Sequence, residues 1–153
     1  MLGYPKAEDV KKLLIIVLLG VALCGLYEAN PSFIKSFTEQ STPDDQLLTS
    51  AYENRQSNIQ VGGSGVVVKI LPDDLQGSRH QKFILRLSSG QTILISHNID
   101  LARRVDTLRE GDTVEFFGEY EWNSKGGVVH WTHHDPDGRH KVGWLKHNGA
   151  IYQ

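Results

Sequence analysis

Histidine is concentrated toward the C-terminal end of this chain. All seven histidines follow residue 79, and five of them lie among the last 24 residues. The densest stretch is HWTHHDPDGRH at residues 130–140, where imidazoles stand beside aspartates and a tryptophan. Neutral imidazoles and carboxylates bind metal ions and transfer protons, so we expect any chemistry of this protein to lie in this segment.

The spacing of these histidines limits which of them could share a metal ion. His130 and His134 point the same way on an ideal strand, but at roughly 3.3 Å per residue they lie about 13 Å apart. The order Asp-Pro-Asp-Gly at residues 135–138 predicts a type I turn that folds His140 back toward the strand. The candidate metal ligands are His133, His134, Asp135 and His140. Such a set suits a divalent transition metal such as zinc, copper or nickel.

The same residues also fit functions without a metal. The aspartates could cap the turn while the histidines lie on a wet surface and Trp131 packs into the domain. A histidine near its ordinary pKa of about 6.5 could transfer protons. No nucleophile accompanies them, because the single cysteine is Cys24 and no serine lies in a GxSxG motif. These observations favour a binding protein over an enzyme, with a histidine-based metal protein, including a metal-dependent hydrolase or nuclease, as the alternative.

From residue 61 onward, short β-type runs alternate with turn signals, as is typical of a small all-β domain. The predicted strands are residues 66–71, 81–87, 91–97, 113–122 and 128–133. One short helix is predicted between the third and fourth strands, because Leu101, Val105 and Leu108 recur at helical spacing. Residues 141–153 are predicted to form a final hairpin.

The fourth strand carries the clearest alternation. Its predicted buried face comprises Val114, Phe116, Gly118, Tyr120 and Trp122, and its other face comprises Glu115, Glu119 and Glu121. Gly118 is predicted to stand at a barrel corner. Gly62, Gly63 and Gly65 are expected to permit strand curvature, because no Gly-Lys-Ser/Thr follows them as a phosphate-binding loop would require.

The order of three strands, a helix and two strands resembles the OB fold, a small five-stranded Greek-key barrel. This resemblance implies a ligand surface on the second and third strands and their loops, where OB barrels bind oligonucleotides or oligosaccharides. The candidate ligand-binding residues are His80, Lys82, Arg86, His130, Trp131, His133, His134, Asp135, Asp137 and His140. The net charge of −2 gives no basic field for nucleic acid, so a saccharide, a peptide or an envelope protein is the preferred partner.

The N-terminal part of the chain reads as a targeting segment. Residues 13–26, LLIIVLLGVALCGL, form an apolar run that follows Lys11 and Lys12. This pattern predicts a hydrophobic helix that serves as a signal peptide or a signal anchor in the inner membrane, with the rest of the chain exported to the periplasm. Cleavage before Gly25, retention as an anchor and acylation of Cys24 all stay open.

Three regions follow from these patterns. Residues 1–26 are the predicted targeting segment, residues 27–60 a polar tether with transient helix, and residues 61–153 the barrel. Because Cys24 is the only cysteine, the exported part can form no internal disulfide.

A closer resemblance covers about residues 62–153. The motifs HQKFIL, GQT, HNIDLA, EYEWN, GGVVHWTHHDP and KHNGxxYQ occur together in this order. In this combination the chain resembles the bacterial family called domain of unknown function 3465. The resemblance implies a bacterial origin and a domain over these residues, and it assigns no catalytic residue.

Overall fold

The computed structural model describes residue 8, residues 11–12 and residues 43–153. Residues 43–153 belong to one compact unit. Its elements are α3 (Pro43–Glu53), β1 (Ile59–Ile70), β2 (His80–Arg86), β3 (Thr92–Asn98), β4 (Thr113–Glu121), β5 (Val128–His130), β6 (Trp144–His147) and β7 (Ala150–Tyr152). No helix in the part of the chain that the structure describes has the length and apolar character of a membrane span. The predicted targeting helix, residues 13–26, and the tether up to residue 42 lie outside the described residues.

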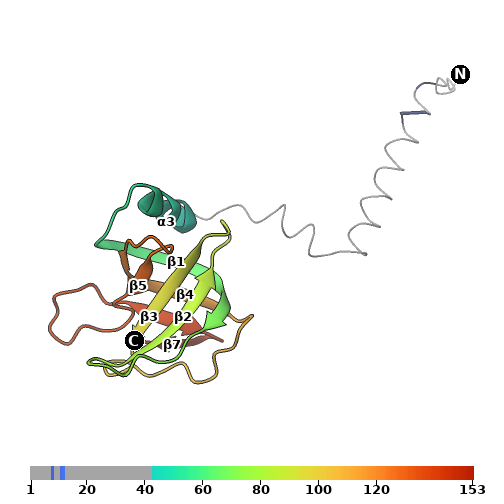
Figure 1. The fold of residues 1–153 in the computed structure, drawn as a ribbon. Coiled ribbons are helices and arrows are strands. Elements are labelled where there is room, and N and C mark those ends of the chain that lie inside the picture. Colours follow the sequence, from blue (N-terminus) through green and yellow to red (C-terminus); the bar gives the residue numbers. More distant parts are fainter. Residues whose placement is uncertain (1–7, 9–10, 13–42) are drawn as a thin grey trace, which may run out of the picture. The chain divides into compact units, whose positions relative to one another are not determined.

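Five strands close into a barrel (Figure 1). They follow the order β1-β2-β3-β5-β4, and β4 pairs back with β1. The β3–β5 pair is parallel and the other pairs are antiparallel. The β6–β7 hairpin, predicted from residues 141–153, extends the sheet from the edge of β4. The prediction of a mostly β, five-stranded barrel is confirmed, and it is consistent with an OB-like fold.

The barrel interior is filled by the alternating apolar side chains of the strands. Phe83 and Leu85 of β2 and Phe116 and Tyr120 of β4 are fully buried. The outward positions between them are half-buried or exposed. This period-two alternation is what the sequence predicts, because successive strand side chains point to opposite faces.

The folded domain starts before the predicted boundary at residue 61. Part of the predicted tether, residues 27–60, instead forms α3, whose Leu48 and Ala51 are fully buried and join the barrel core. The first strand also begins at Ile59, well before the predicted start at residue 66. Few side chains of α3 are buried. The segment is therefore mostly polar in sequence, and its composition does not indicate that it packs against the barrel.

The prediction of a helix between the third and fourth strands is wrong. Residues 99–112 form turns, although Val105 is buried as expected. The buried side-chain amide of Gln81 donates from Nε2 to Val105 O at 3.0 Å, and Val105 N donates to Gln81 Oε1 at 2.9 Å. Leu101, predicted to share the buried helical face, is 43% exposed. The apolar spacing predicts hydrogen bonds within a helix. In the fold, hydrogen bonds between the distant Gln81 side chain and this segment take their place.

The two edges of β4 are used differently. One edge pairs with β1 from residue 113 to residue 120. The other edge is divided, since β6 pairs with residues 114–117 and β5 pairs with residues 119–121. Gly118 lies at the changeover, where a Cβ would stand 2.8 Å from Val129 Cγ1 and 2.9 Å from Thr132 Cγ2. Close approach of β5 and the loop that follows therefore requires glycine at this position.

The fifth strand is shorter than predicted. It ends at His130, not at residue 133, and Trp131 adopts a left-handed conformation with φ of 52°. The chain turns away at this point because the next part of the β4 edge is occupied by β6. Trp131 is consequently half-buried and does not pack in the barrel interior.

Replacing Gly118 by alanine should destabilise the barrel, because the added Cβ would press on β5 and on Thr132. We expect the free energy of unfolding to fall by roughly 1–3 kcal/mol, as in other overpacked sites. Urea unfolding followed by tryptophan fluorescence measures this change. Gly62→Ala is the matched control, because its Cβ would meet Phe117 Cδ2 at an ordinary 3.4 Å. Equal stability of the two variants would contradict the role given to Gly118.

Candidate functional site

Residues 131–143, here called the histidine loop, connect β5 to β6 and project from the barrel (Figure 1). Two buried hydrogen bonds close the base of this loop. Thr132 Oγ1 lies 2.8 Å from His97 Nδ1, and Gly143 N donates to His133 O at 3.1 Å. A Cβ on Gly143 would stand 2.6 Å from Phe117 O, so glycine is needed where the loop returns to the sheet. The base of the histidine loop is therefore fixed by the barrel.

Asp135 organises the turn inside the histidine loop. Gly138 N donates to Asp135 O at 3.1 Å, which confirms the turn predicted over residues 135–138. The Asp135 carboxylate accepts hydrogen bonds from the backbone N–H groups of Asp137, Arg139 and His140. Burial would raise the pKa of Asp135, but these three donors outweigh it and the pKa lies below its ordinary value. The Asp135 carboxylate thus stabilises the turn.

The turn brings His140 back to the barrel, as the sequence predicts. Its ring stacks on Trp131 with centroids 3.7 Å apart and an interplanar angle of 12°. Its Nδ1 lies 3.3 Å from Glu119 Oε2 on β4. His140 therefore links the loop to the outer face of β4 and holds the Trp131 ring in place.

A pocket of about 320 Å³ opens beside the base of the histidine loop. We call it the histidine pocket, and its lining residues are Ser78, His80, Asn98, His130, Trp131 and His133. They come from the start of β2 and the segment just before it, the end of β3, the end of β5 and the histidine loop. The strand order brings these positions together, because β3 pairs with β2 on one edge and with β5 on the other.

Backbone carbonyls select the tautomers of two imidazoles in this pocket. His80 Nδ1 lies 2.7 Å from Ser78 O, and His133 Nδ1 lies 2.8 Å from His134 O. A carbonyl only accepts, so each Nδ1 carries the hydrogen and each Nε2 is an acceptor when the ring is neutral. His133 is buried, whereas His80 is partly open to solvent.

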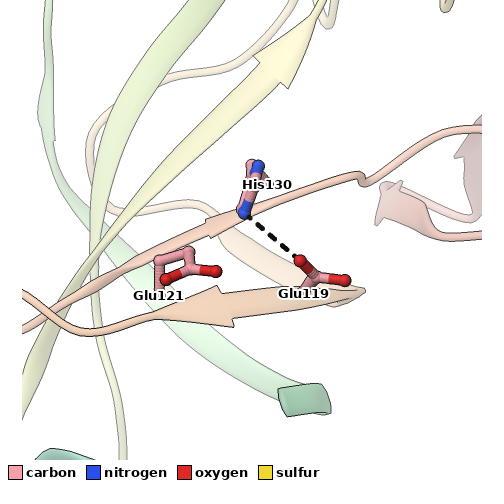
Figure 2. Close-up of side chains that lie close together, drawn as sticks. All are labelled: Glu119, Glu121 and His130. Carbon is pink, nitrogen blue, oxygen red and sulfur yellow. Dashed lines mark ion pairs between the residues drawn. The ribbon is translucent and has the colours of Figure 1, made fainter. Parts of the chain in front are cut away.

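A second cluster lies on the outer face of β4 and β5 (Figure 2). Figure 2 shows Glu119 and Glu121 on one strand and His130 on its neighbour, with the side chains turned toward one another. One ligand atom of each residue lies within 4.8 Å of the other two, and His130 Nε2 is 3.9 Å from Glu119 Oε1. Burial lowers the pKa of His130 from its ordinary value, although the two carboxylates favour its charged form. These three side chains have the chemistry of metal ligands.

Only part of the predicted site is assembled by the fold. His80, His130, Trp131 and His133 line one pocket, and His140 lies against the Trp131 ring. The other predicted ligand-binding residues lie elsewhere: Lys82 pairs with Asp74, Arg86 and His134 are exposed, Asp135 caps its turn, and Asp137 pairs with Arg139. The predicted metal set of residues 133, 134, 135 and 140 is not among the metal-ligand groupings of the described residues.

Sequence reasoning missed the two glutamates and two pocket residues. The sequence pattern places Glu119 and Glu121 only on the face of the fourth strand opposite its apolar residues, and it does not identify Ser78 or Asn98 as ligand-binding residues. The hairpin between the fourth and fifth strands contains the signal for the glutamates. With its turn at residues 123–127, Glu119 pairs with His130, which places both side chains on one face.

Acidification should destabilise the protein through His97. This side chain is fully buried, and burial lowers its pKa to about 4 in the folded state, against about 6.5 unfolded. Below pH 6.5 the unfolded chain binds a proton that the folded chain does not, so stability falls by up to about 1.4 kcal/mol per pH unit until pH approaches 4. Urea unfolding of wild type and His97→Gln across this range should give a flatter pH dependence for the variant.

The exposed His134 supplies the control for this measurement. His134→Gln should keep the pH dependence of the wild type. If His97→Gln and wild type lost stability in parallel as the pH fell, His97 would not be the group responsible.

Comparison with known proteins identifies the family of this chain. No curated protein matches it. A family model described as "Protein of unknown function (DUF3465)" matches residues 32–153. The match includes α3, all seven strands, the histidine pocket and the cluster on β4 and β5. The chain, in which these sites lie on a closed five-stranded barrel, therefore belongs to the family DUF3465.

Proposed function

We propose that this protein is an exported binding module of the bacterial envelope, anchored in the inner membrane or released into the periplasm, and that it holds a saccharide in the histidine pocket. The observation that carries the proposal is the convergence of three imidazoles, a tryptophan, a serine and an amide on one pocket. Its volume of about 320 Å³ lies at the lower end of the range for small-ligand sites.

The lining of the pocket matches the chemistry of sugar hydroxyl groups. A sugar hydroxyl both donates and accepts hydrogen bonds. The Nε2 atoms of His80 and His133 are acceptors in the tautomers that their carbonyl partners select, and Asn98 supplies an amide that does both. Trp131 adds an apolar ring, against which the C–H groups of a sugar can pack.

Charge around the pocket argues against an anionic ligand. The pocket lining includes no lysine or arginine. Lys82 is the basic residue of β2 that is nearest in sequence to His80. Its Nζ lies 3.2 Å from Asp74 Oδ2, and the two charges offset each other. Glu119 and Glu121 lie close to His130 on the adjoining face. A phosphate-rich ligand such as a nucleic acid would meet carboxylates here and no lysine or arginine of the pocket lining.

Export is supported by the N-terminal sequence. The apolar run at residues 13–26 follows Lys11 and Lys12, in the order of a targeting segment with a cytoplasmic basic flank. A saccharide ligand suits this location because glycans are abundant in the bacterial envelope.

Saccharide binding can be tested on the full chain in detergent micelles, with a tetramer of N-acetylglucosamine as the probe. Saturation transfer from the protein to the sugar protons should be observed. Trp131→Ala should abolish it, because the apolar wall of the pocket is lost. Trp144→Ala is the matched control, since it removes an aromatic side chain that stacks on Phe117 and does not line the pocket.

Three results would contradict saccharide binding. They are absence of transfer to the sugar, equal loss of transfer in both tryptophan variants, and binding of a single-stranded oligonucleotide or a neutral tetrapeptide in place of the sugar. The last result would leave the pocket as a ligand site for a different class of molecule.

Export can be tested with an alkaline phosphatase reporter fused after Gln153. The reporter is active only in the oxidising periplasm, where its disulfides form. We expect activity from the full-length fusion and none from a fusion that lacks residues 1–26. Activity confined to a cytoplasmic reporter such as β-galactosidase would show that the predicted topology is wrong.

A further inference from the structure

The cluster of Glu119, Glu121 and His130 shares no residue with the metal-ligand set that the sequence predicts. From its geometry we infer that these three residues bind a divalent transition-metal ion such as zinc. The site goes beyond saccharide binding, because two of its three residues do not line the histidine pocket. Its donor set of two carboxylates and one imidazole is of the kind that zinc and related metal ions accept.

Only small movements would bring the three ligand atoms to coordination distance from one metal ion. Tetrahedral ligands at roughly 2.1 Å from zinc lie roughly 3.4 Å from one another. His130 Nε2 is already 3.9 Å from Glu119 Oε1, and all three ligand atoms lie within 4.8 Å of one another. The three residues stand on paired strands, so only side-chain rotations are needed to reach coordination distance (Figure 2).

The negative charges of Glu119 and Glu121 favour binding of a cation. No described lysine or arginine lies within ion-pair distance of Glu119 or Glu121. By contrast Glu115, on the same strand and the same face, pairs with Lys146 at 2.9 Å. Two neighbouring carboxylates without a lysine or arginine partner repel each other, and a divalent ion would remove that repulsion.

His130 offers the cluster a buried ring nitrogen. Its Nε2 atom is buried and has no hydrogen-bond partner among the described residues. The separation of 3.9 Å from Glu119 Oε1 is too long for a hydrogen bond. A buried nitrogen without a partner is costly, and coordination to a metal would satisfy it.

His140 supports the site from the histidine loop. Its Nδ1 lies 3.3 Å from Glu119 Oε2, the carboxylate oxygen other than the one facing His130. This contact orients Glu119, in the way that outer partners orient the ligands of known metal sites. Three protein ligands leave coordination positions for water or a ligand. Because His130 also lines the histidine pocket, the metal would lie at the border of that pocket.

Metal binding can be measured by adding Co²⁺ to the full chain after treatment with a chelator. We expect visible d–d absorption that saturates at one equivalent, and Zn²⁺ should displace the cobalt. Glu119→Gln and Glu121→Gln keep side-chain size but remove charge. Each should weaken binding by at least the roughly 10- to 100-fold that loss of an outer partner costs. Thermal unfolding confirms that each variant is folded.

Two control variants distinguish binding at this cluster from binding by neighbouring carboxylates or exposed histidines. Glu115→Gln removes the same charge from the same face of β4 and should leave cobalt affinity unchanged. His134→Ala should also leave it unchanged, because His134 is exposed and outside the cluster. The inference is overturned by an absence of cobalt absorption in wild type, by unchanged affinity in the Glu121→Gln variant, or by an equal loss in Glu115→Gln.

Discussion

The divided edge of β4 is the constraint on which the rest of this structure depends. β6 pairs with residues 114–117 of this edge and β5 pairs with residues 119–121. Two strands therefore share the backbone hydrogen-bonding groups of one edge. The chain can leave β5 only where β6 begins, and it does so at Trp131 with a left-handed backbone. Gly118 and Gly143 make the crossing possible, because a side chain at either position would collide with the neighbouring backbone.

This crossing explains why the imidazoles and carboxylates of the two candidate sites gather at one edge of the barrel. The histidine loop leaves and rejoins the sheet beside Gly118, so its base is held by buried contacts such as that between Thr132 and His97. The loop then returns His140 to the outer face of β4, where it meets Glu119. His130, the last residue of β5, borders both the histidine pocket and the acidic cluster. A ligand in the pocket and a metal on the strand face would therefore be neighbours.

Much of the barrel could be predicted because strand alternation is a local property of the chain. The buried faces of β2 and β4 and the final hairpin follow from apolar periodicity and turn residues. The errors fall where a distant residue decides the local conformation. Gln81 bonds both backbone groups of Val105 and so replaces a helix by turns. Likewise, the fifth strand stops at His130 because another strand occupies the edge that it would need.

The sequence by itself determined the succession of strands, the buried faces and the turn at residues 135–138. Each of these depends on neighbours along the chain, which the sequence displays directly. Only the tertiary structure decided which side chains meet. The Asp135 carboxylate is used by backbone N–H groups of its own turn, whereas Glu119 and Glu121 face His130 through strand pairing. Such selection depends on register and on close packing between segments far apart in sequence, and residue spacing alone does not encode it.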